Sequence, residues 1–305
     1  MICKKFYKYL QFFYNISMAL EKGDTIGIIA LSGNCDKKKI EIAKLNFEAL
    51  GYKVELSKNI FKQTRYLAGS DTVKIEELHR FYEEPEIKLI LAARGGYGAV
   101  RLINKIDYDL IKNNPKPLCG FSDVTALLLM IYKKTGIINY HSPMACTDFG
   151  VQVPSYFTTD SFFNALNLDT LEFDGEKTYR DGQAEGIIWG GNLSTVISLC
   201  GQDFIPDEDF IFFAEDLNEP VYKIDRMFHQ LMNIDKFLDN CRAVVLGDFL
   251  GVDSQNWLED FFTELSQKLG VPVVSGFKIS HGKYKITLPV GANATLDGLK
   301  LILNK

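Results

Sequence analysis

The chain has 305 residues, a formal net charge of −5, and 47% hydrophobic and 24% charged residues. This is the composition of a globular protein of about two domains. The acidic balance and the lack of a Lys/Arg tract argue against nucleic acid as a partner. No apolar stretch approaches the ~18 residues of a membrane helix, so we expect no membrane partner either.

Residues 1–22 are expected to form an N-terminal extension. Residues 1–17 are basic and aromatic, and a second methionine, Met18, follows them. Lys8, Gln11 and Asn15 interrupt the apolar part, which disfavours a signal peptide. The six cysteines are scattered and include no C-x-x-C pair, so the sequence predicts reduced thiols and a cytoplasmic location.

Residues 23–150 alternate apolar strand patterns with amphipathic helix patterns. This alternation predicts an α/β domain with a doubly wound, mostly parallel sheet. Such sheets bind ligands at the carboxyl ends of their strands. Strands are expected at 25–31, 52–56, 88–93, 117–121 and 137–140.

Sharp turns follow two of these strands at their carboxyl ends. Residues 94–98 form a glycine-rich turn, and Ser122 and Asp123 follow the strand at 117–121. Strand, tight turn with a serine, then helix is the layout of a nucleophile elbow, with an oxyanion hole at the helix N-terminus. Two other interpretations remain open. Ser122 can simply cap the following helix, and the glycine turn can cradle a phosphate, although it lacks both a P-loop ending and G-x-G-x-x-G spacing.

The pattern changes near residue 150. Residues 151–182 are turn-rich and are expected to connect two domains. Residues 183–305 predict a smaller, β-rich α/β domain. Its expected strands lie at 183–189, 210–213, 243–247 and 271–274, followed by short β segments around 286–289, 294–296 and 299–303.

A serine nucleophile needs a histidine base and an acceptor that orients the base. His79 and His229 lie within helix patterns and are expected at the surface, whereas His141 follows the fifth strand and could line the cleft. His281 lies in a loop and is followed by glycine, which suits a side chain that projects into a cleft. Glu215 ends a buried strand and is a candidate acceptor, although an acid there can instead cap the next helix.

Six short motifs follow one another along the chain: Arg-Gly-Gly-Tyr-Gly at 94–98, Gly-Phe-Ser-Asp at 120–123, Gly-Gly-Asn-Leu-Ser at 190–194, Glu-Asp-Leu-Asn-Glu-Pro at 215–220, Tyr-Lys-Ile-Asp-Arg at 222–226 and Ser-His-Gly at 280–282. Taken together and in this order, they resemble the motifs of the L,D-carboxypeptidases. This is a serine peptidase family that also includes microcin-C self-immunity peptidases. The resemblance extends from about residue 23 to 303. The chain differs from the usual family pattern in having Leu31 in place of a proline and Ser280 in place of a glycine.

The resemblance implies a catalytic triad of Ser122, Glu215 and His281, with no metal or cofactor. It also implies an N-terminal domain similar to class I glutamine amidotransferases and assembly as a homodimer. The amides of Asp123 and Gly96 are the expected oxyanion donors, with Gly95 as an alternative to Gly96.

Arg94 and Asn192 are candidates for binding the substrate. Arg94 can hold a terminal carboxylate through two parallel hydrogen bonds. The structural alternative is that Arg94 pairs with an acid such as Asp123 and only supports the loop.

The expected reaction is release of terminal D-alanine from murein tetrapeptides during cell-wall recycling. The alternative is a microcin-C-type immunity peptidase that cleaves a peptidyl or aminoacyl nucleotide. A third hypothesis is an inactive ligand-binding homologue. An intact Ser, Glu and His set argues against the third.

Overall fold

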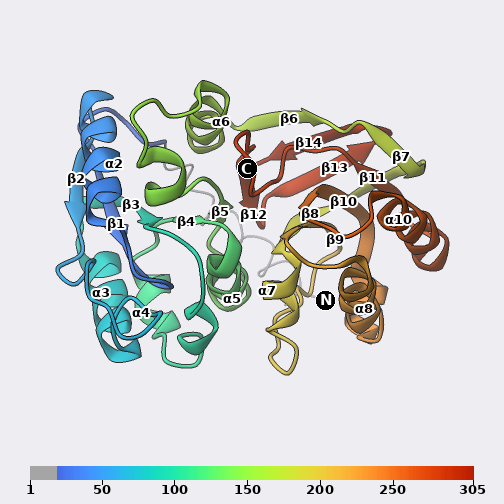
Figure 1. Cartoon of the computed structure of the whole chain (residues 1–305), viewed down its shortest axis with the longest axis horizontal. Helices are drawn as coiled ribbons and strands as arrows, with labels where there is room; N and C mark the ends of the chain where they lie inside the picture. The colour runs from blue at the N-terminus through green and yellow to red at the C-terminus, as the bar shows by residue number, and fades with distance from the viewer. Residues whose placement is uncertain (1–18) are drawn as a thin grey trace, which may run out of the picture.

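The computed structural model describes residues 19–305, so residues 1–18 of the expected extension lie outside the described part. Two lobes lie side by side (Figure 1). Each is built around its own sheet, and both sheets mix parallel and antiparallel pairs. The α/β class predicted from the sequence is confirmed.

The N-terminal lobe contains a six-stranded sheet in the order β12-β5-β4-β3-β1-β2. The pairs from β5 to β2 are all parallel, as predicted for a doubly wound sheet. Its strands are β1 (Thr25–Ile29), β2 (Lys53–Leu56), β3 (Ile87–Ala92), β4 (Leu118–Gly120), β5 (Asn139–His141) and β12 (Leu288–Val290). The helical segments of this lobe are α2 (Lys37–Ala49), α3 (Asp71–Glu83), α4 (Tyr108–Asn113), α5 (Thr125–Thr135) and α6 (Tyr156–Asn167), with short turns η2 (Ala99–Arg101), η3 (Ser122–Val124) and η4 (Ala145–Phe149).

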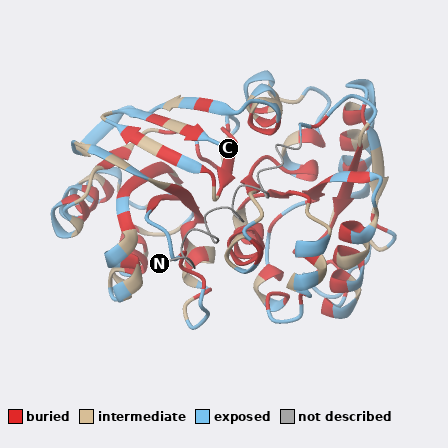
Figure 2. Cartoon of the chain, turned by 180° about the vertical axis from the view of Figure 1, so that it is seen from behind, coloured by how far each residue is buried: buried red, intermediate tan, exposed pale blue. Residues whose placement is uncertain are grey.

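The central strands of this sheet are buried because helices cover both of its faces. Every residue of β1 and β4 is buried, whereas the outer helices keep exposed faces (Figure 2). The continuous apolar runs in the sequence are typical of such strands. The carboxyl ends of β1, β3 and β4 therefore meet at one edge of the sheet.

The C-terminal lobe contains an eight-stranded sheet in the order β6-β14-β13-β8-β9-β10-β11-β7. Strands β8 to β11 run parallel, and antiparallel strands flank them. Its strands are β6 (Thr170–Asp174), β7 (Lys177–Arg180), β8 (Gln183–Asn192), β9 (Phe210–Leu217), β10 (Cys241–Leu250), β11 (Val273–Ser275), β13 (Asn293–Asp297) and β14 (Lys300–Asn304). Its helices are α7 (Leu193–Ile197), α8 (Val221–Met232), α9 (Asp235–Asn240) and α10 (Gln255–Leu269).

Residues 151–182, which we expected to connect the domains, contain regular structure. They form α6 and then β6 and β7, the two outermost strands of the C-terminal sheet. Both strands are largely exposed, so their sequences are polar and lack the apolar pattern of a buried strand. The C-terminal sheet therefore begins at residue 170 rather than at 183.

A late segment of the chain returns to the N-terminal lobe. Strand β12 pairs antiparallel with β5, with Leu288 opposite His141. Just beyond β12, the Gly291 amide donates to the Ile188 carbonyl at 2.8 Å, and the Ile188 amide donates to the Ala292 carbonyl at 2.8 Å. Residues 288–292 therefore join the two sheets through backbone hydrogen bonds.

None of the helices within residues 19–305 combines the length and the apolar character that crossing a bilayer requires.

Candidate active site

Ser122 lies in a strained turn at the end of β4. Its φ is +60°, which is uncommon for a residue with a side chain. The turn η3 follows at once and leads into α5. The Asp123 carboxylate accepts a hydrogen bond from the Ala99 amide at 2.8 Å and so attaches this turn to the glycine-rich loop. This is the predicted layout of strand, tight turn and helix.

The glycine-rich loop after β3 lies directly against Ser122. A Cβ on Gly95 would be 2.9 Å from the Ser122 Cβ and 3.0 Å from its Oγ. The Gly33 amide holds this loop by donating to the Gly95 carbonyl at 3.1 Å. Within residues 19–305, neither Gly95 nor Gly96 donates its amide to an acceptor. Either amide is therefore free for a ligand beside Ser122.

The helix that follows Ser122 contacts the C-terminal lobe at close range. A Cβ on Gly191 would lie 2.4 Å from the Thr125 side chain, and the Asn192 amide donates to Thr125 Oγ1 at 3.2 Å. Gly191 also has a φ of +154°. Gly191, the second glycine of the 190–194 motif, thus lets the end of β8 approach the helix that follows Ser122.

Glu215 and His281 form a hydrogen-bonded pair in the C-terminal lobe. The His281 Nδ1 atom lies 2.6 Å from Glu215 Oε2. Glu215 is fully buried near the end of β9, and the His281 side chain keeps 14% of its surface exposed. An imidazole oriented in this way presents its second nitrogen away from the carboxylate.

Burial raises the pKa of Glu215, and the His281 bond opposes that rise. The other carboxylate oxygen, Oε1, has no partner within residues 19–305. The neighbouring Asp216 also has a raised pKa, because burial outweighs the amide donors of Leu217 and Ser194. The site therefore holds two desolvated carboxyl groups, of which Glu215 contacts His281.

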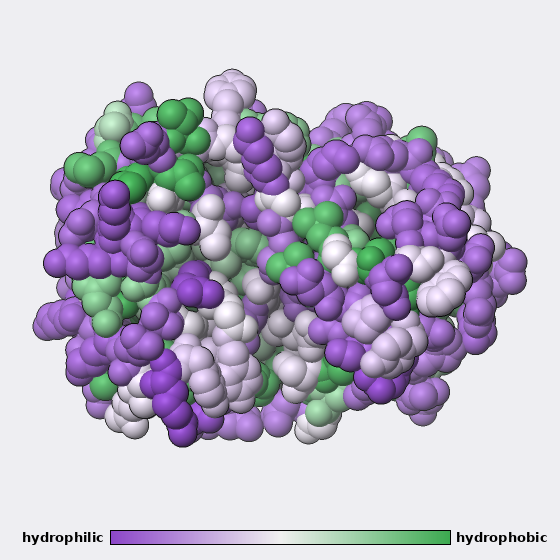
Figure 3. All heavy atoms as spheres, in the orientation of Figure 1, coloured by the Kyte–Doolittle hydropathy of each residue, from purple (hydrophilic) through white to green (hydrophobic). Residues whose placement is uncertain are grey.

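His281 lies beside the turn that carries Ser122. Its ring packs edge-on against Phe121, with centroids 4.8 Å apart, and Phe121 directly precedes Ser122. The structure thus brings His281 and Glu215 from one lobe to the turn that carries Ser122 on the other. In Figure 3 the surface is hollowed between the lobes, and less hydrophilic residues gather there.

The other histidines occupy different surroundings. His141 is 2% exposed and packs between the rings of Phe121 and Phe213. Burial, with the nearby charges of His281 and Lys285, lowers the pKa of His141 to about 3, so it stays neutral in the fold at ordinary pH. His79 accepts a hydrogen bond from the Asp107 amide, and His229 contacts Lys268 across α8 and α10.

Arg94 is exposed at the end of β3, beside the glycine loop. It donates to the Asn34 carbonyl at 3.2 Å and has no ion pair within residues 19–305. The pairing with Asp123 that we considered is absent from the described part of the chain, because the Asp123 carboxylate takes the Ala99 amide instead. The guanidinium is thus available to a ligand.

Asn192 is buried and caps α7. Its oxygen accepts from the Thr195 amide at 3.1 Å, and its nitrogen donates to Asp216 at 2.9 Å. To contact a substrate, the Asn192 side chain would have to use an atom that already makes one of these bonds.

Cys119 lies on β4 close to the turn but is fully buried, and burial raises its pKa. A buried thiol with a raised pKa is unreactive. Ser122 is the accessible nucleophile candidate in this region.

Two buried charged residues near His281 were not recognised from the sequence. Lys285 and Asp148 form an ion pair beside Phe121. Their positions, 137 residues apart, carry no motif that would have indicated the pair.

Comparison with known proteins gives the class to which this fold and site belong. Residues 26–142 match the LD-carboxypeptidase N-terminal domain, and residues 185–296 match the LD-carboxypeptidase C-terminal domain. The chain belongs to the LD-carboxypeptidase family. A carboxypeptidase is a peptidase, and the expected family membership is confirmed.

Individual relatives cover nearly the whole chain. It is 35% identical to a probable murein peptide carboxypeptidase of Bacillus subtilis, over 92% of this chain and 90% of that protein. The solved muramoyltetrapeptide carboxypeptidase of Oxalobacter formigenes superposes with a TM-score of 0.85 at 28% identity, covering 92% of this chain and 99% of that one. An MccF-like protein of Bacillus anthracis superposes with a TM-score of 0.88 at 26% identity, over 94% and 98% of the two chains.

Proposed function

We propose that this protein is a serine L,D-carboxypeptidase that releases terminal D-alanine from murein tetrapeptides. The observation that carries the proposal is the 2.6 Å bond between His281 and the buried Glu215. The His281 ring packs against Phe121, the residue before Ser122. An oriented imidazole beside the turn that carries a half-buried serine is the arrangement that activates a hydroxyl.

Ser122 attacks the carbonyl carbon of the scissile bond while His281 accepts its proton. The tetrahedral oxyanion is held by the amides of Asp123 and Gly96, with Gly95 as the alternative donor. His281 then gives the proton to the departing amine, which leaves as D-alanine. Water, deprotonated by His281, hydrolyses the acyl-enzyme and restores Ser122.

Glu215 keeps His281 in the tautomer that leaves Nε2 free to accept the proton. Because Glu215 is fully buried, water does little to stabilise the negative charge of its carboxylate. The positive charge that forms on His281 then stabilises the carboxylate. This contribution grows in the transition state, as catalysis requires.

The murein substrate is supported by the Bacillus subtilis relative and the Oxalobacter formigenes structure, both named for such peptides. Arg94 suits the free carboxylate of the terminal D-alanine, because its guanidinium is exposed and has no ion pair within residues 19–305. Asn192 is the weaker candidate for substrate binding, since its amide group is already bonded to Asp216 and Thr195.

A microcin-C-type activity is the second candidate, favoured by the superposition on the MccF-like protein. An aromatic clamp for a nucleotide base would have to lie between Ser122 and Glu215. Trp189 is the one tryptophan in that segment. It is fully buried among Phe204, Phe210 and Phe212, so it is part of the core.

We also propose a cytoplasmic homodimer that acts on recycled cell-wall fragments. The free thiols of all five cysteines in residues 19–305 support a reducing compartment. Size-exclusion chromatography with light scattering tests the dimer.

The activity is tested by giving the enzyme purified murein tetrapeptide and, separately, an aminoacyl sulfamoyl adenosine. We expect free D-alanine and tripeptide from the first and little cleavage of the second. Faster cleavage of the sulfamoyl adenosine would replace the proposed function with the second candidate.

A further inference from the structure

We propose that the ion pair between Lys285 and Asp148 is a positioning device that holds His281 against the nucleophile turn. The inference rests on the proposed function of Ser122 and His281. Lys285 and Asp148 lie outside the triad, and their ion pair fixes the position of the base. Neither residue is placed in contact with substrate.

Lys285 is buried and contacts both sides of the site. Its Nζ donates to Asp148 Oδ1 at 2.5 Å and to the Gly282 carbonyl at 2.6 Å. It also lies over the Phe121 ring, 5.2 Å from the centroid. One ammonium group thus binds the residue after His281, the residue before Ser122 and an acid on η4.

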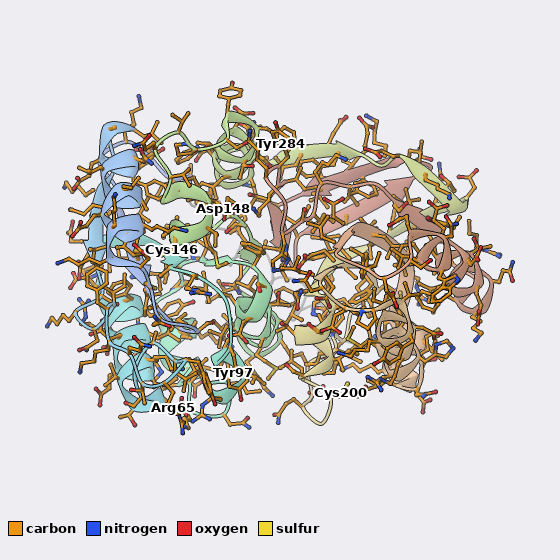
Figure 4. The ribbon with its side chains drawn as sticks, viewed as in Figure 1. Arg65, Tyr97, Cys146, Asp148, Cys200 and Tyr284 are labelled. Atoms are coloured by element: carbon orange, nitrogen blue, oxygen red, sulfur yellow. The ribbon has the colours of Figure 1, made fainter. Side chains whose placement is uncertain are left out.

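Asp148 is itself held rigidly. Its second oxygen accepts from the Met144 amide at 2.8 Å and from Thr147 Oγ1 at 2.6 Å. The same turn is attached to the residue just before the glycine-rich loop, because the Cys146 amide donates to the Ala93 carbonyl at 2.8 Å. In Figure 4, Asp148 lies between Cys146 and Tyr284 on the inner side of the N-terminal lobe.

These contacts form a continuous path from the start of the glycine-rich loop to the base. It runs from Ala93 through Cys146 and Asp148 to Lys285, and then to Gly282 beside His281. The histidine loop needs such support because it lies outside regular structure. Its backbone on the other side is held by the Asp248 amide, which donates to the Ile279 carbonyl at 2.8 Å.

Burial makes this pair a firm constraint. The side chains of Lys285 and Asp148 are 7% and 6% exposed. Neither charge can be withdrawn into solvent without moving the loop, and a buried charge without its partner is strongly disfavoured. The pair therefore restricts the distance between His281 and Ser122 more tightly than an exposed ion pair would.

The test measures how fast a fluorophosphonate labels Ser122, alongside the melting temperature. The reagent's phosphorus bonds to Ser122 Oγ, fluoride leaves, and His281 takes the hydroxyl proton, so the rate reports how well the base is placed. Lys285→Met should slow labelling by about 10-fold or more, since small misplacement of catalytic groups is costly. The kcat for the tetrapeptide should fall with it while KM changes little.

The matched control is Lys133→Met. The Lys133 side chain is also buried, with 8% of its surface exposed, and its ammonium pairs across the lobes with Asp207 at 2.8 Å. Lys133 lies on α5, however, and makes no contact with the histidine loop within residues 19–305. The reagent should label Ser122 of Lys133→Met at a rate within about two-fold of the wild-type rate. A double variant, Lys285→Met with Asp148→Asn, leaves no unpaired buried charge and should melt near wild type while labelling slowly.

Labelling of Lys285→Met or of the double variant at the wild-type rate would overturn the positioning role. Equal slowing in Lys133→Met would overturn it too, because any bridge between the lobes would then have the same effect. A wild-type protein that the reagent does not label at Ser122 would contradict the proposed function itself.

Discussion

A methyl group on Gly95 would lie 2.9 Å from the Cβ of Ser122. Real Cβ atoms do not approach side chains so closely, so either the serine or the loop must shift. Gly95→Ala should therefore lower kcat by about 100-fold, because an error near 1 Å in the site costs that much. Gly95 is absent from the positive-φ positions, so alanine meets no backbone strain and the melting temperature should change little. If Gly95→Ala kept the wild-type kcat, the glycine-rich loop would not lie against Ser122 during the reaction.

Glu215→Gln should remove activity and yet stabilise the fold at neutral pH. Losing the carboxylate leaves His281 in the wrong tautomer, and kcat should drop by about 10⁴-fold. The pKa of Glu215 is raised in the fold by burial, so the native state loses stability as pH rises above the unfolded-state pKa of ~4.3. Glutamine does not titrate and avoids this loss.

The stability half of that prediction is checked by denaturant unfolding at pH 4 and pH 8. The unfolding free energy of Glu215→Gln relative to wild type should be greater at pH 8 than at pH 4. A variant that is less stable at pH 8 would mean that the His281 bond outweighs the cost of burying the carboxylate.

His141 should make the fold sensitive to acid. Its pKa is about 3 in the fold and ~6.5 unfolded, so between these values only the unfolded chain binds the proton. Stability is then fully present above pH 6.5 and falls by up to about 1.4 kcal/mol per pH unit below it. His141→Phe fits the aromatic surroundings and should lose less stability between pH 7.5 and pH 5. Equal losses in both proteins would show that folding does not lower the pKa of His141.

Arg94→Lys should raise KM for the tetrapeptide and leave the labelling of Ser122 unchanged. Lysine keeps the charge but cannot bind a carboxylate through two parallel bonds. Initial rates on the free acid and on its C-terminal amide provide the comparison. If the wild-type enzyme cleaves the amide as fast as the acid, no carboxylate-binding residue is needed.

Much of the N-terminal lobe could be predicted because its signals are local. The apolar runs at β1, β3 and β4 end in glycine or serine turns, and parallel strands place those turns at one edge. Ser122 and the 94–98 loop were expected to meet on these grounds alone. Choosing His281 among the histidines required the family resemblance, because a loop histidine carries no periodic pattern.

Other features depend on contacts between distant residues and left no local signal. Strands β6 and β7 are exposed and polar, so their sequences predict a connection instead of strands. Strand β12 joins the N-terminal sheet although its sequence lies within the C-terminal region. The Lys285–Asp148 pair follows from how the two lobes pack, which no spacing in the sequence records.

We propose that Ser122 is the nucleophile that cleaves the terminal bond of murein tetrapeptide. The most direct measurement is the rate of D-alanine release from purified tetrapeptide by wild type and by Ser122→Ala, with equal melting temperatures as the check on folding. We predict a loss of about 10⁴-fold or more, since members of a triad act as a unit. Release by the folded variant within ten-fold of the wild-type rate would contradict the claim.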